Sequence, residues 1–496
     1  MNREVRGRPT VEPIEPIVVI GAGASGLLTA RALLRAGDPS VVLIERDASW
    51  STGPAYATRD AQHLLNVPAG KLGVDHDRPF DFVDWASRRM PDVTPCAFLP
   101  RSHYGTYLRD LLDTTARTAH LSRRSHLARV TGTATRVDPG SSRTFDRPAA
   151  RVHLGDGRSI DAAHVVLALG NPRPRPLAGD TEHVIDDPWS PCAVDAVAPE
   201  DAVVIVGTGL TAIDVALTLA ARGHRGPLQM VSRRGLLPRP HDLRATSAVA
   251  VEVPPRADAL TARSAMRWLR GAIADAGGDW RAVFDAVRPH TNEMWSRLSE
   301  PERARLLRHA GRYWEVHRHR IAPEVAERAG ELVATGRLRL RTGGVERIER
   351  RSRSASRVVV RAPHGDRPVI DAHWVVNCTG PDFDLRRSGG ALVRGLLGEG
   401  LARPGFLGLG FDVAPDGSLV DASGGMVASM SVVGPMRRGS EWETTAIPEL
   451  RAQAEQVTAR ITSARPAPTL HRGAHRRGAR MSLRRAPIGG ISARID

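Results

Sequence analysis

The sequence predicts an α/β fold made of two similar units, each built on a parallel β-sheet, with a helical insertion. Two glycine-rich turns indicate the units: Gly21-Ala22-Gly23-Ala24-Ser25-Gly26 and Gly207-Thr208-Gly209-Leu210-Thr211-Ala212. Each turn follows a short apolar run typical of a buried parallel strand and precedes a segment with helical periodicity. Residues 161–170 and 371–380 share an order of Asp, small residues, His, an apolar run and Gly, which indicates an internal duplication.

The first unit begins with a strand at 17–20, a helix at 25–36 and a second strand at 41–44. A loop rich in glycine and proline follows from Gly53 to Gly73, and a helix is expected at 104–112. Turn signals within 129–168 predict an antiparallel meander that ends in the strand before Gly170.

The first turn has the features of a dinucleotide site. In a strand–turn–helix unit, Gly21 permits the tight turn, Gly23 lets the backbone approach a pyrophosphate, and Gly26 lets the helix pack closely on the strand. The helix N-terminus adds partial positive charge facing the phosphates. Glu45, at the end of the second strand, is placed to accept hydrogen bonds from ribose hydroxyls.

The second turn differs in the residues that end its second strand. That strand, 228–231, is followed by Ser232-Arg233-Arg234 where the first unit has an acid. An acid would repel a 2′-phosphate, whereas two arginines and a hydroxyl would bind it through charge-assisted hydrogen bonds. We therefore expect NADP(H) here, the alternative being a surface arginine pair.

A helical insertion is predicted over residues 258–330, inside the second unit. Trp280, Val283, Phe284 and Val287 fall on one helical face, and Ser299 with Glu302 has capping-box spacing. The insertion is the expected specificity element, and its run His317-Arg318-His319-Arg320 either binds an anionic substrate or is a solvated basic face. A second meander at 338–377 and a last helix from about Pro448 complete the pattern.

Several longer motifs resemble a bacterial family of FAD/NAD(P)-binding proteins that has the two-domain fold of glutathione-reductase type. They are Gly53-Pro54-Ala55-Tyr56, His63 to Ala69, Phe98 to Arg101 with Tyr104-Gly105, Ser232 to Pro238, Gly434-Pro435, Arg438-Gly439 and Trp442 to Glu449. The resemblance covers roughly residues 16–462. It implies that the first unit holds FAD and that the second, inserted unit holds NADPH.

The resemblance and the turns together predict domains and site residues. The FAD-binding domain is expected at 16–190 and 345–462, the NADP-binding domain at 200–344, and flexible termini at 1–15 and 463–496. The FAD contacts are predicted at Gly21, Gly23, Ala24, Ser25, Gly26, Glu45, Arg46, Asn66, Gly170, Gly434 and Thr445. The NADP contacts are predicted at Gly207, Thr208, Gly209, Thr211, Ser232, Arg233 and Arg234.

The number and spacing of the cysteines limit the types of reaction to be considered. Cys96, Cys192 and Cys378 are far apart and none has metal-site or dithiol spacing, so neither a metal centre nor a disulfide reductase is expected. Electrons from NADPH then pass to O2 or directly to a substrate. Some relatives in the resembled family are similar to flavin-dependent N-hydroxylating monooxygenases of amino acids, which use a flavin hydroperoxide.

We expect a monooxygenase that acts on a small polar amine or amino acid. The catalytic residues are not assigned, and His63, Lys71 and Arg101 are candidates near the flavin loop. An NADPH-dependent reductase with another acceptor, or a non-catalytic flavin redox sensor, is the alternative.

The charge and hydrophobicity of the sequence limit the partners that can be expected. The formal charge is +16, and Lys71 is the only lysine among 70 basic residues, which indicates arginine-rich codon usage more than nucleic-acid binding. Residues 464–496 hold eight arginines and one acid and are predicted to be disordered. No apolar stretch is long enough for a membrane span or signal peptide, so we expect a cytoplasmic protein. The sequence does not indicate an oligomeric state.

Overall fold

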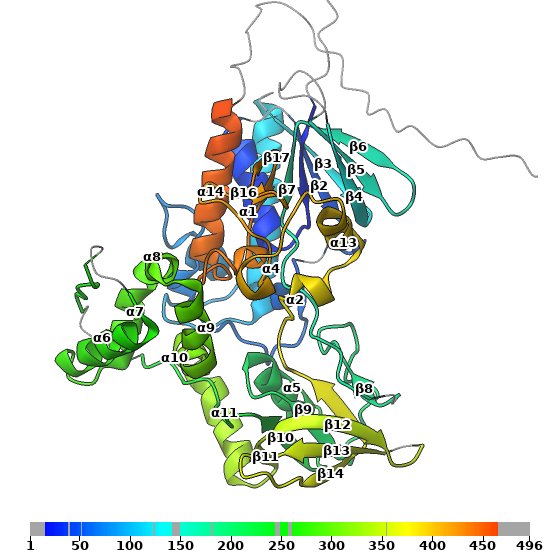
Figure 1. The fold of residues 1–496 in the computed structure, drawn as a ribbon, viewed down its shortest axis with the longest axis vertical. Coiled ribbons are helices and arrows are strands. Elements are labelled where there is room, and N and C mark those ends of the chain that lie inside the picture. Colours follow the sequence, from blue (N-terminus) through cyan, green and yellow to red (C-terminus); the bar gives the residue numbers. More distant parts are fainter. Residues whose placement is uncertain are drawn as a thin grey trace, which may run out of the picture.

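The computed structural model describes residues 15–464 except 38–39, 51, 123–124, 141–148, 180–181, 244–248, 256–259 and 354. The termini predicted to be flexible fall almost wholly outside the described residues. Figure 1 shows one unit above the other along the long axis, with the insertion helices at one side.

The first unit is built on a six-stranded sheet with the order β16-β17-β7-β1-β2-β3. Its central strand β1 pairs in parallel with β2 and β7, and all four residues of β1 are buried. The strands are β1 (Ile17–Ile20), β2 (Ser40–Glu45), β3 (His126–Thr131), β7 (His164–Leu167), β16 (Ser418–Val420) and β17 (Met426–Val432).

Helices cover one face of this sheet and a meander covers the other. Helix α1 (Ala24–Arg35) packs between α4 (Arg101–Leu121) and α14 (Ile447–Ala464). On the opposite face lie the meander β4 (Ala134–Pro139), β5 (Ala150–Leu154) and β6 (Ser159–Ala162), and α13 (Ala391–Gly398). Apolar side chains on both faces form separate cores, as expected for a buried parallel sheet.

The second unit repeats this plan with a five-stranded sheet of order β11-β10-β9-β15-β8. Its strands are β8 (Val184–Ile185), β9 (Val203–Val206), β10 (Leu228–Ser232), β11 (Leu338–Thr342) and β15 (Trp374–Asn377). Helices α5 (Leu210–Ala221) and α11 (Pro323–Ala334) cover one face. The meander β12 (Gly344–Arg350), β13 (Ser356–Arg361) and β14 (Val369–Ala372) covers the other. The duplication predicted from the sequence therefore corresponds to two units of the same design.

The domain boundaries differ from the predicted ones. Residues 184–190 and 345–380 were expected in the first unit, yet β8 and β15 pair within the second sheet and β12–β14 pack against it. The physical reason is the duplication itself. The strand that closes each unit must pair with that unit's own first strand, as β15 does with β9.

The insertion consists of α6 (Ala262–Asp275), α7 (Trp280–Val287), α8 (Thr291–Arg297), α9 (Glu300–His309) and α10 (Gly311–Arg318). The predicted apolar face of α7 is buried at Val283, Phe284 and Val287. The capping box predicted at Ser299 is not formed, because the Glu302 carboxylate accepts a hydrogen bond from the Ala262 N–H at 2.7 Å. A capping box forms instead at Thr261 and Ser264, at the start of α6.

Short helical segments complete the fold. They are α2 (Pro54–Ala57), α3 (Asp81–Ser87), α12 (Leu385–Ser388), and the 3-10 turns Ala69–Lys71, Arg288–His290, Phe406–Gly408 and Pro435–Arg437. Within the described ranges, every helix is too short or too polar to cross a bilayer.

Candidate functional site

The first glycine turn places different demands on its three glycines. Gly21 has φ +103°, and a β-carbon there would lie 2.4 Å from the Ala168 carbonyl oxygen. A β-carbon on Gly26 would lie 1.8 Å from the carbonyl oxygen of Gly21. Gly23 has φ −65°, and a β-carbon there would meet only the Thr52 carbonyl oxygen, at 3.9 Å. Protein packing therefore requires Gly21 and Gly26 but leaves open space above Gly23.

Two further glycines border that space. Gly53 adopts φ +84°, and its β-carbon would lie 3.5 Å from the α-carbon of Gly23. Gly434 adopts φ +93°, and its β-carbon would lie 2.3 Å from the Ser25 hydroxyl oxygen. The N-terminus of α1 has no side-chain cap, so its first N–H groups are available to an anion. We call this open space above Gly23, with the free N–H groups of α1, the first cradle. It fits the pyrophosphate of a dinucleotide.

Glu45 ends β2 beside the same cradle. Its carboxylate accepts hydrogen bonds from the backbone N–H groups of Ala22, at 2.8 Å, and Asp47, at 3.1 Å. A carboxylate has about four acceptor positions, so Glu45 can still accept hydrogen bonds from ribose hydroxyls. The two backbone bonds also hold the side chain against the turn.

The other predicted FAD contacts lie on separate segments of the chain. Arg46 is exposed, and Gly170 has φ +70° with open space at its β-position, just beyond β7. Asn66 lies in the loop after α2, and its backbone carbonyl oxygen accepts a hydrogen bond from the His241 ring. Thr445 is two residues before α14.

The second turn repeats the geometry with different chemistry. Gly207 has φ +122°, and a β-carbon there would lie 2.2 Å from the Cys378 carbonyl oxygen. The buried Thr208 hydroxyl donates to the Leu236 carbonyl oxygen at 2.7 Å and lies 2.9 Å from the Ser232 hydroxyl. Gly209 precedes α5 and provides no side-chain cap, which leaves the helix N–H groups available.

The two arginines after β10 are exposed at this edge of the second sheet. Arg234 donates to the Arg308 carbonyl oxygen at 3.3 Å, and its guanidinium lies 5.3 Å from the ring centre of Tyr313. Neither arginine has a carboxylate partner among the residues that the structure describes. Their charges are therefore available to an anionic ligand. Thr211 is partly buried in the first turn of α5.

His63 and Arg101, two of the catalytic candidates, connect the two units. His63 Nε2 lies 2.9 Å from the Thr218 hydroxyl, and Arg101 forms an ion pair with Asp214 at 2.8 Å. Both partners lie on α5, beyond its first turn. Burial lowers the pKa of His63, which favours its neutral form. These contacts give both residues a role in joining the units.

Lys71, the third candidate, lies elsewhere. Its ammonium group is 3.3 Å from a carboxylate oxygen of Asp285 on α7, and both side chains are about half exposed. Asp285 also pairs with the buried guanidinium of Arg320. The structure therefore brings Lys71 to the insertion and separates it in role from His63 and Arg101.

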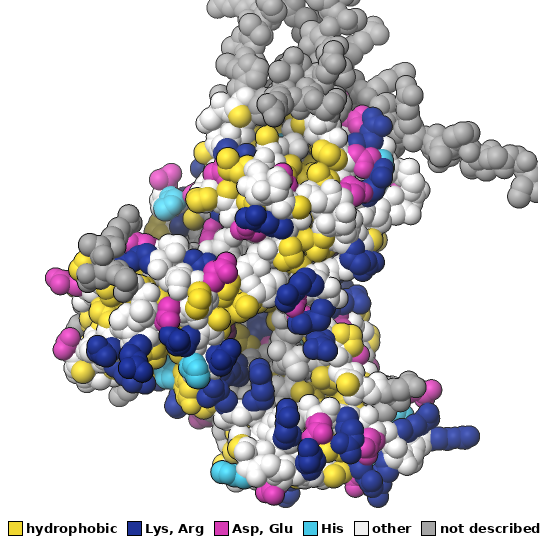
Figure 2. Space-filling model, viewed as in Figure 1, with side chains coloured by type: hydrophobic (Ala, Val, Ile, Leu, Met, Phe, Trp, Pro, Cys, Tyr) yellow, Lys and Arg dark blue, Asp and Glu magenta, His cyan; other side chains and the backbone are white. Residues whose placement is uncertain are grey.

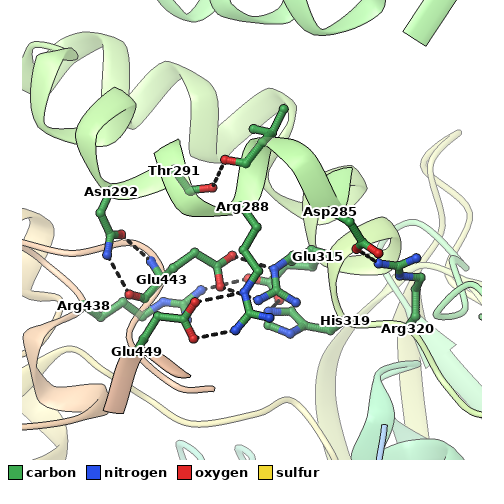
Figure 3. A network of polar contacts seen from close by, with 12 residues as sticks. Asp285, Arg288, Thr291, Asn292, Glu315, His319, Arg320, Arg438, Glu443 and Glu449 are labelled. Atoms are coloured by element: carbon green, nitrogen blue, oxygen red, sulfur yellow. Dashed lines mark hydrogen bonds and ion pairs between the residues drawn. The ribbon is translucent and has the colours of Figure 1, made fainter. Parts of the chain in front are cut away.

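A set of charged side chains joins the insertion to the segment that precedes and begins α14 (Figure 3). Arg318 forms two hydrogen bonds with Glu443, at 3.0 and 2.8 Å, and Arg288 forms two with Glu449, at 2.9 and 2.6 Å. Arg438 lies 2.8 Å from Glu315, and Asn292 pairs with the backbone of Glu443. We call these contacts the seam. Burial alone would raise the pKa of the Glu315 carboxyl, but the nearby His319 together with the charge and hydrogen bond of Arg438 keeps it below its usual value.

Sequence reasoning named several seam residues, among them Arg318 and Arg438, but did not pair them, and a single sequence contains no signal that would have done so. Arg318 was expected to bind an anionic substrate or to lie on a solvated face, whereas its side chain pairs with Glu443 and is largely buried. The partners are separated by more than a hundred residues, as in the Arg318 and Glu443 pair. His241 was also missed. Its Nε2 donates to the Asn66 carbonyl oxygen at 2.9 Å, and burial with the nearby charge of Arg320 lowers its pKa to about 4.

This shift gives His241 a specific effect on acid stability. In the unfolded chain the imidazole binds a proton near its ordinary pKa, whereas in the folded protein it stays neutral down to about pH 4. Stability is therefore lost as the pH falls from about 6.5 to about 4, by up to about 3 kcal/mol. Glutamine at position 241 keeps a neutral hydrogen-bond donor that does not titrate. Between about pH 7 and pH 4.5, we therefore expect the free energy of unfolding of His241→Gln, measured in urea, to fall by about 2–3 kcal/mol less than that of the wild type. His76→Gln, at an exposed position, is the control, and parallel losses in His241→Gln and wild type would contradict this assignment.

Comparisons with known proteins agree with this fold. Residues 18–172 match the model of a family described as FAD-NAD(P)-binding. No curated protein matches the sequence significantly. Among solved structures, an L-lysine 6-monooxygenase from Pseudomonas syringae is 17% identical, with a TM-score of 0.62, covering 91% of this chain and 100% of that chain. An ornithine N-hydroxylase from Kutzneria, solved with reduced FAD, NADP+ and L-ornithine, is 17% identical, with a TM-score of 0.58, covering 91% and 99%.

A bacillithiol disulfide reductase from Staphylococcus aureus is similar too, at 12% identity and a TM-score of 0.52, covering 90% of this chain and 99% of that chain. These likenesses confirm the predicted fold of two dinucleotide-binding units. The family match confirms the predicted cofactor classes, a flavin dinucleotide with a nicotinamide dinucleotide.

Proposed function

We propose that this chain, whose first unit belongs with FAD-NAD(P)-binding domains, is an NADPH-dependent FAD monooxygenase that hydroxylates a small polar substrate, with an amine or amino acid nitrogen favoured. The observation that carries the proposal is the difference between the two strand ends. Glu45 faces the first cradle, whereas Arg233 and Arg234 follow β10 without carboxylate partners among the described residues. An acid suits the ribose hydroxyls of FAD, and arginines suit the 2′-phosphate of NADPH.

The segment from Gly434 to α14 supports a flavin in the first unit. A bound FAD, held at the turn of Gly21, Gly23 and Gly26 and by Glu45, would supply the redox chemistry that carries two electrons from NADPH to O2. Reduced flavin carries negative charge, and the N-terminus of α14 is an electropositive end suited to stabilise it. Glu449, in the first turn of this helix, would oppose that effect, but Arg288 pairs with it at 2.6 Å. The seam thus preserves the positive character of the helix end.

The positions of the cysteines favour O2 as the electron acceptor over a pair of redox-active thiols. The three cysteines are free, with Cys96 and Cys192 exposed and Cys378 buried. Burial raises the pKa of the Cys378 thiol, so it stays protonated and unreactive. The N-hydroxylating flavoenzymes among the similar structures also favour an amine substrate, although the disulfide reductase keeps a second acceptor class open.

The proposal is tested by screening amino acids and amines with the purified holoenzyme. A true substrate should consume NADPH and O2 together and give a product heavier by one oxygen atom, because one oxygen atom enters the product and the other leaves as water. Heat-treated enzyme and omission of substrate are the controls. NADPH oxidation that continues unchanged without O2 would contradict the proposal and favour a reductase. Absence of NADPH oxidation under all conditions would favour a redox sensor.

A further inference from the structure

The insertion places a cation, Arg312, at the second glycine turn. The sequence did not assign this residue to the turn. Arg312, in the first turn of α10, donates to the Thr208 hydroxyl at 3.4 Å and to the Leu236 carbonyl oxygen at 3.3 Å. A β-carbon placed on Gly209 would lie 4.0 Å from both terminal nitrogens of Arg312, the nearest atoms of the described residues other than its chain neighbours. The guanidinium therefore covers the turn at the point where its backbone is bare.

Arg312 forms no ion pair with a carboxylate of the described residues. The nearest acid on its own helix, Glu315, pairs with Arg438 and His319. Burial lowers the pKa of Arg312, the negative charge of Glu315 raises it, and the positive charge of Arg233 lowers it further. Two guanidinium groups therefore lie near each other at the second turn. In Figure 2, Lys and Arg side chains gather over the lower part of the insertion and over the second unit. Such an arrangement favours an anion between the arginines.

We propose that Arg312 binds the pyrophosphate of the nicotinamide dinucleotide, so that the insertion forms part of the cofactor site. This inference rests on the assignment of NADPH to the second unit in the proposed function. The second glycine of such a turn is where the backbone approaches the pyrophosphate. Arg312 lies beside that position, at Gly209, whereas Arg233 and Arg234 lie at the end of β10, where the ribose and its 2′-phosphate bind.

The rest of α10 holds Arg312 in place. Glu315, three residues further along the helix, pairs with Arg438 in the seam (Figure 3). Arg318, six residues further along, pairs with Glu443. A guanidinium on an anchored helix loses less conformational freedom when it binds, which raises its contribution to affinity. The same helix therefore connects the nicotinamide dinucleotide site with the segment that precedes α14.

Equilibrium binding to the FAD-loaded protein separates the roles of the arginines. NADP+ and 2′-AMP are the two probes, because 2′-AMP carries the 2′-phosphate but has no pyrophosphate. We expect Arg312→Ala and Arg312→Gln to weaken NADP+ binding about 10- to 100-fold and to leave 2′-AMP binding unchanged. Arg233→Ala should weaken both ligands. Arg270→Ala removes an exposed arginine of α6 as the control for net charge and should change neither.

The outcomes are distinct. Unchanged NADP+ affinity in both Arg312 variants would overturn the inference, and so would an equal loss of NADP+ and 2′-AMP, which would assign Arg312 to the 2′-phosphate. Arg312→Gln keeps a hydrogen-bonding side chain near Thr208, so it covers the case in which the alanine variant is unstable. If the wild-type protein binds no NADP+, the proposed function itself fails.

Discussion

Replacing Gly23 with alanine will give a folded protein that no longer retains FAD. The backbone at Gly23 has φ −65° and ψ −179°, which alanine adopts without strain, and the new methyl group touches nothing closer than 3.9 Å. The methyl group would instead occupy the space that the pyrophosphate needs. We expect FAD affinity to fall roughly 100-fold, as for other added methyl groups in a close-fitting site. The flavin-to-protein ratio after purification and the melting temperature measure the two parts of this result.

Two matched variants give this prediction its control. Gly26→Ala places a β-carbon 1.8 Å from a carbonyl oxygen, so it should disrupt packing as well as binding. Gly209→Ala, the equivalent change in the second turn, should keep FAD and lose NADP+ binding. A yellow Gly23→Ala protein with the wild-type flavin content would contradict the location of FAD in the first unit.

Removing Arg318 will destabilise the protein by about 3–5 kcal/mol, because it leaves the buried Glu443 carboxylate without its cation. The two side chains are only 10% and 4% exposed, so water cannot replace the lost partner. Arg318→Ala should also free the insertion, which limited proteolysis between α6 and α10 would detect. Urea unfolding measures the stability change.

The control for this change is Arg347→Ala, which breaks an exposed pair with Glu349 and should leave stability unchanged within error. The double variant Arg318→Met with Glu443→Leu removes both charges and should recover most of the lost stability, because no buried charge then lacks a partner. If Arg318→Ala is as stable as the wild type, the seam does not hold the insertion.

The parts of the fold set by local geometry could be predicted from the sequence. Glycines at Gly21 and Gly207 permit positive φ, and the apolar runs before them become fully buried strands. Both glycine turns, the strand ends at Glu45 and Ser232, and the helix starting near Pro448 therefore agree with the structure. The boundary at residue 344 was wrong because strand pairing is non-local, and a meander has the same sequence pattern on either unit.

The site was predictable only where the turn motif specifies it. Glu45 follows from its spacing to the turn, and its bond to Ala22 is a local consequence of that spacing. Arg312 was missed because it enters the second turn from a helix about 100 residues away, and nothing in the sequence distinguishes it among the many arginines. His63 and Arg101 looked like substrate groups near the flavin loop, but their partners lie on α5 of the other unit.

The most direct test of the account is reduction of the bound flavin by NADPH under anaerobic conditions, followed by readmission of O2. The account predicts that NADPH bleaches the visible flavin absorption of the wild-type holoenzyme and that O2 restores it. Gly209→Ala should remain yellow and fail to bleach at the same NADPH concentration. A wild-type holoenzyme that NADPH leaves unbleached would contradict the assignment of the two turns to FAD and NADPH.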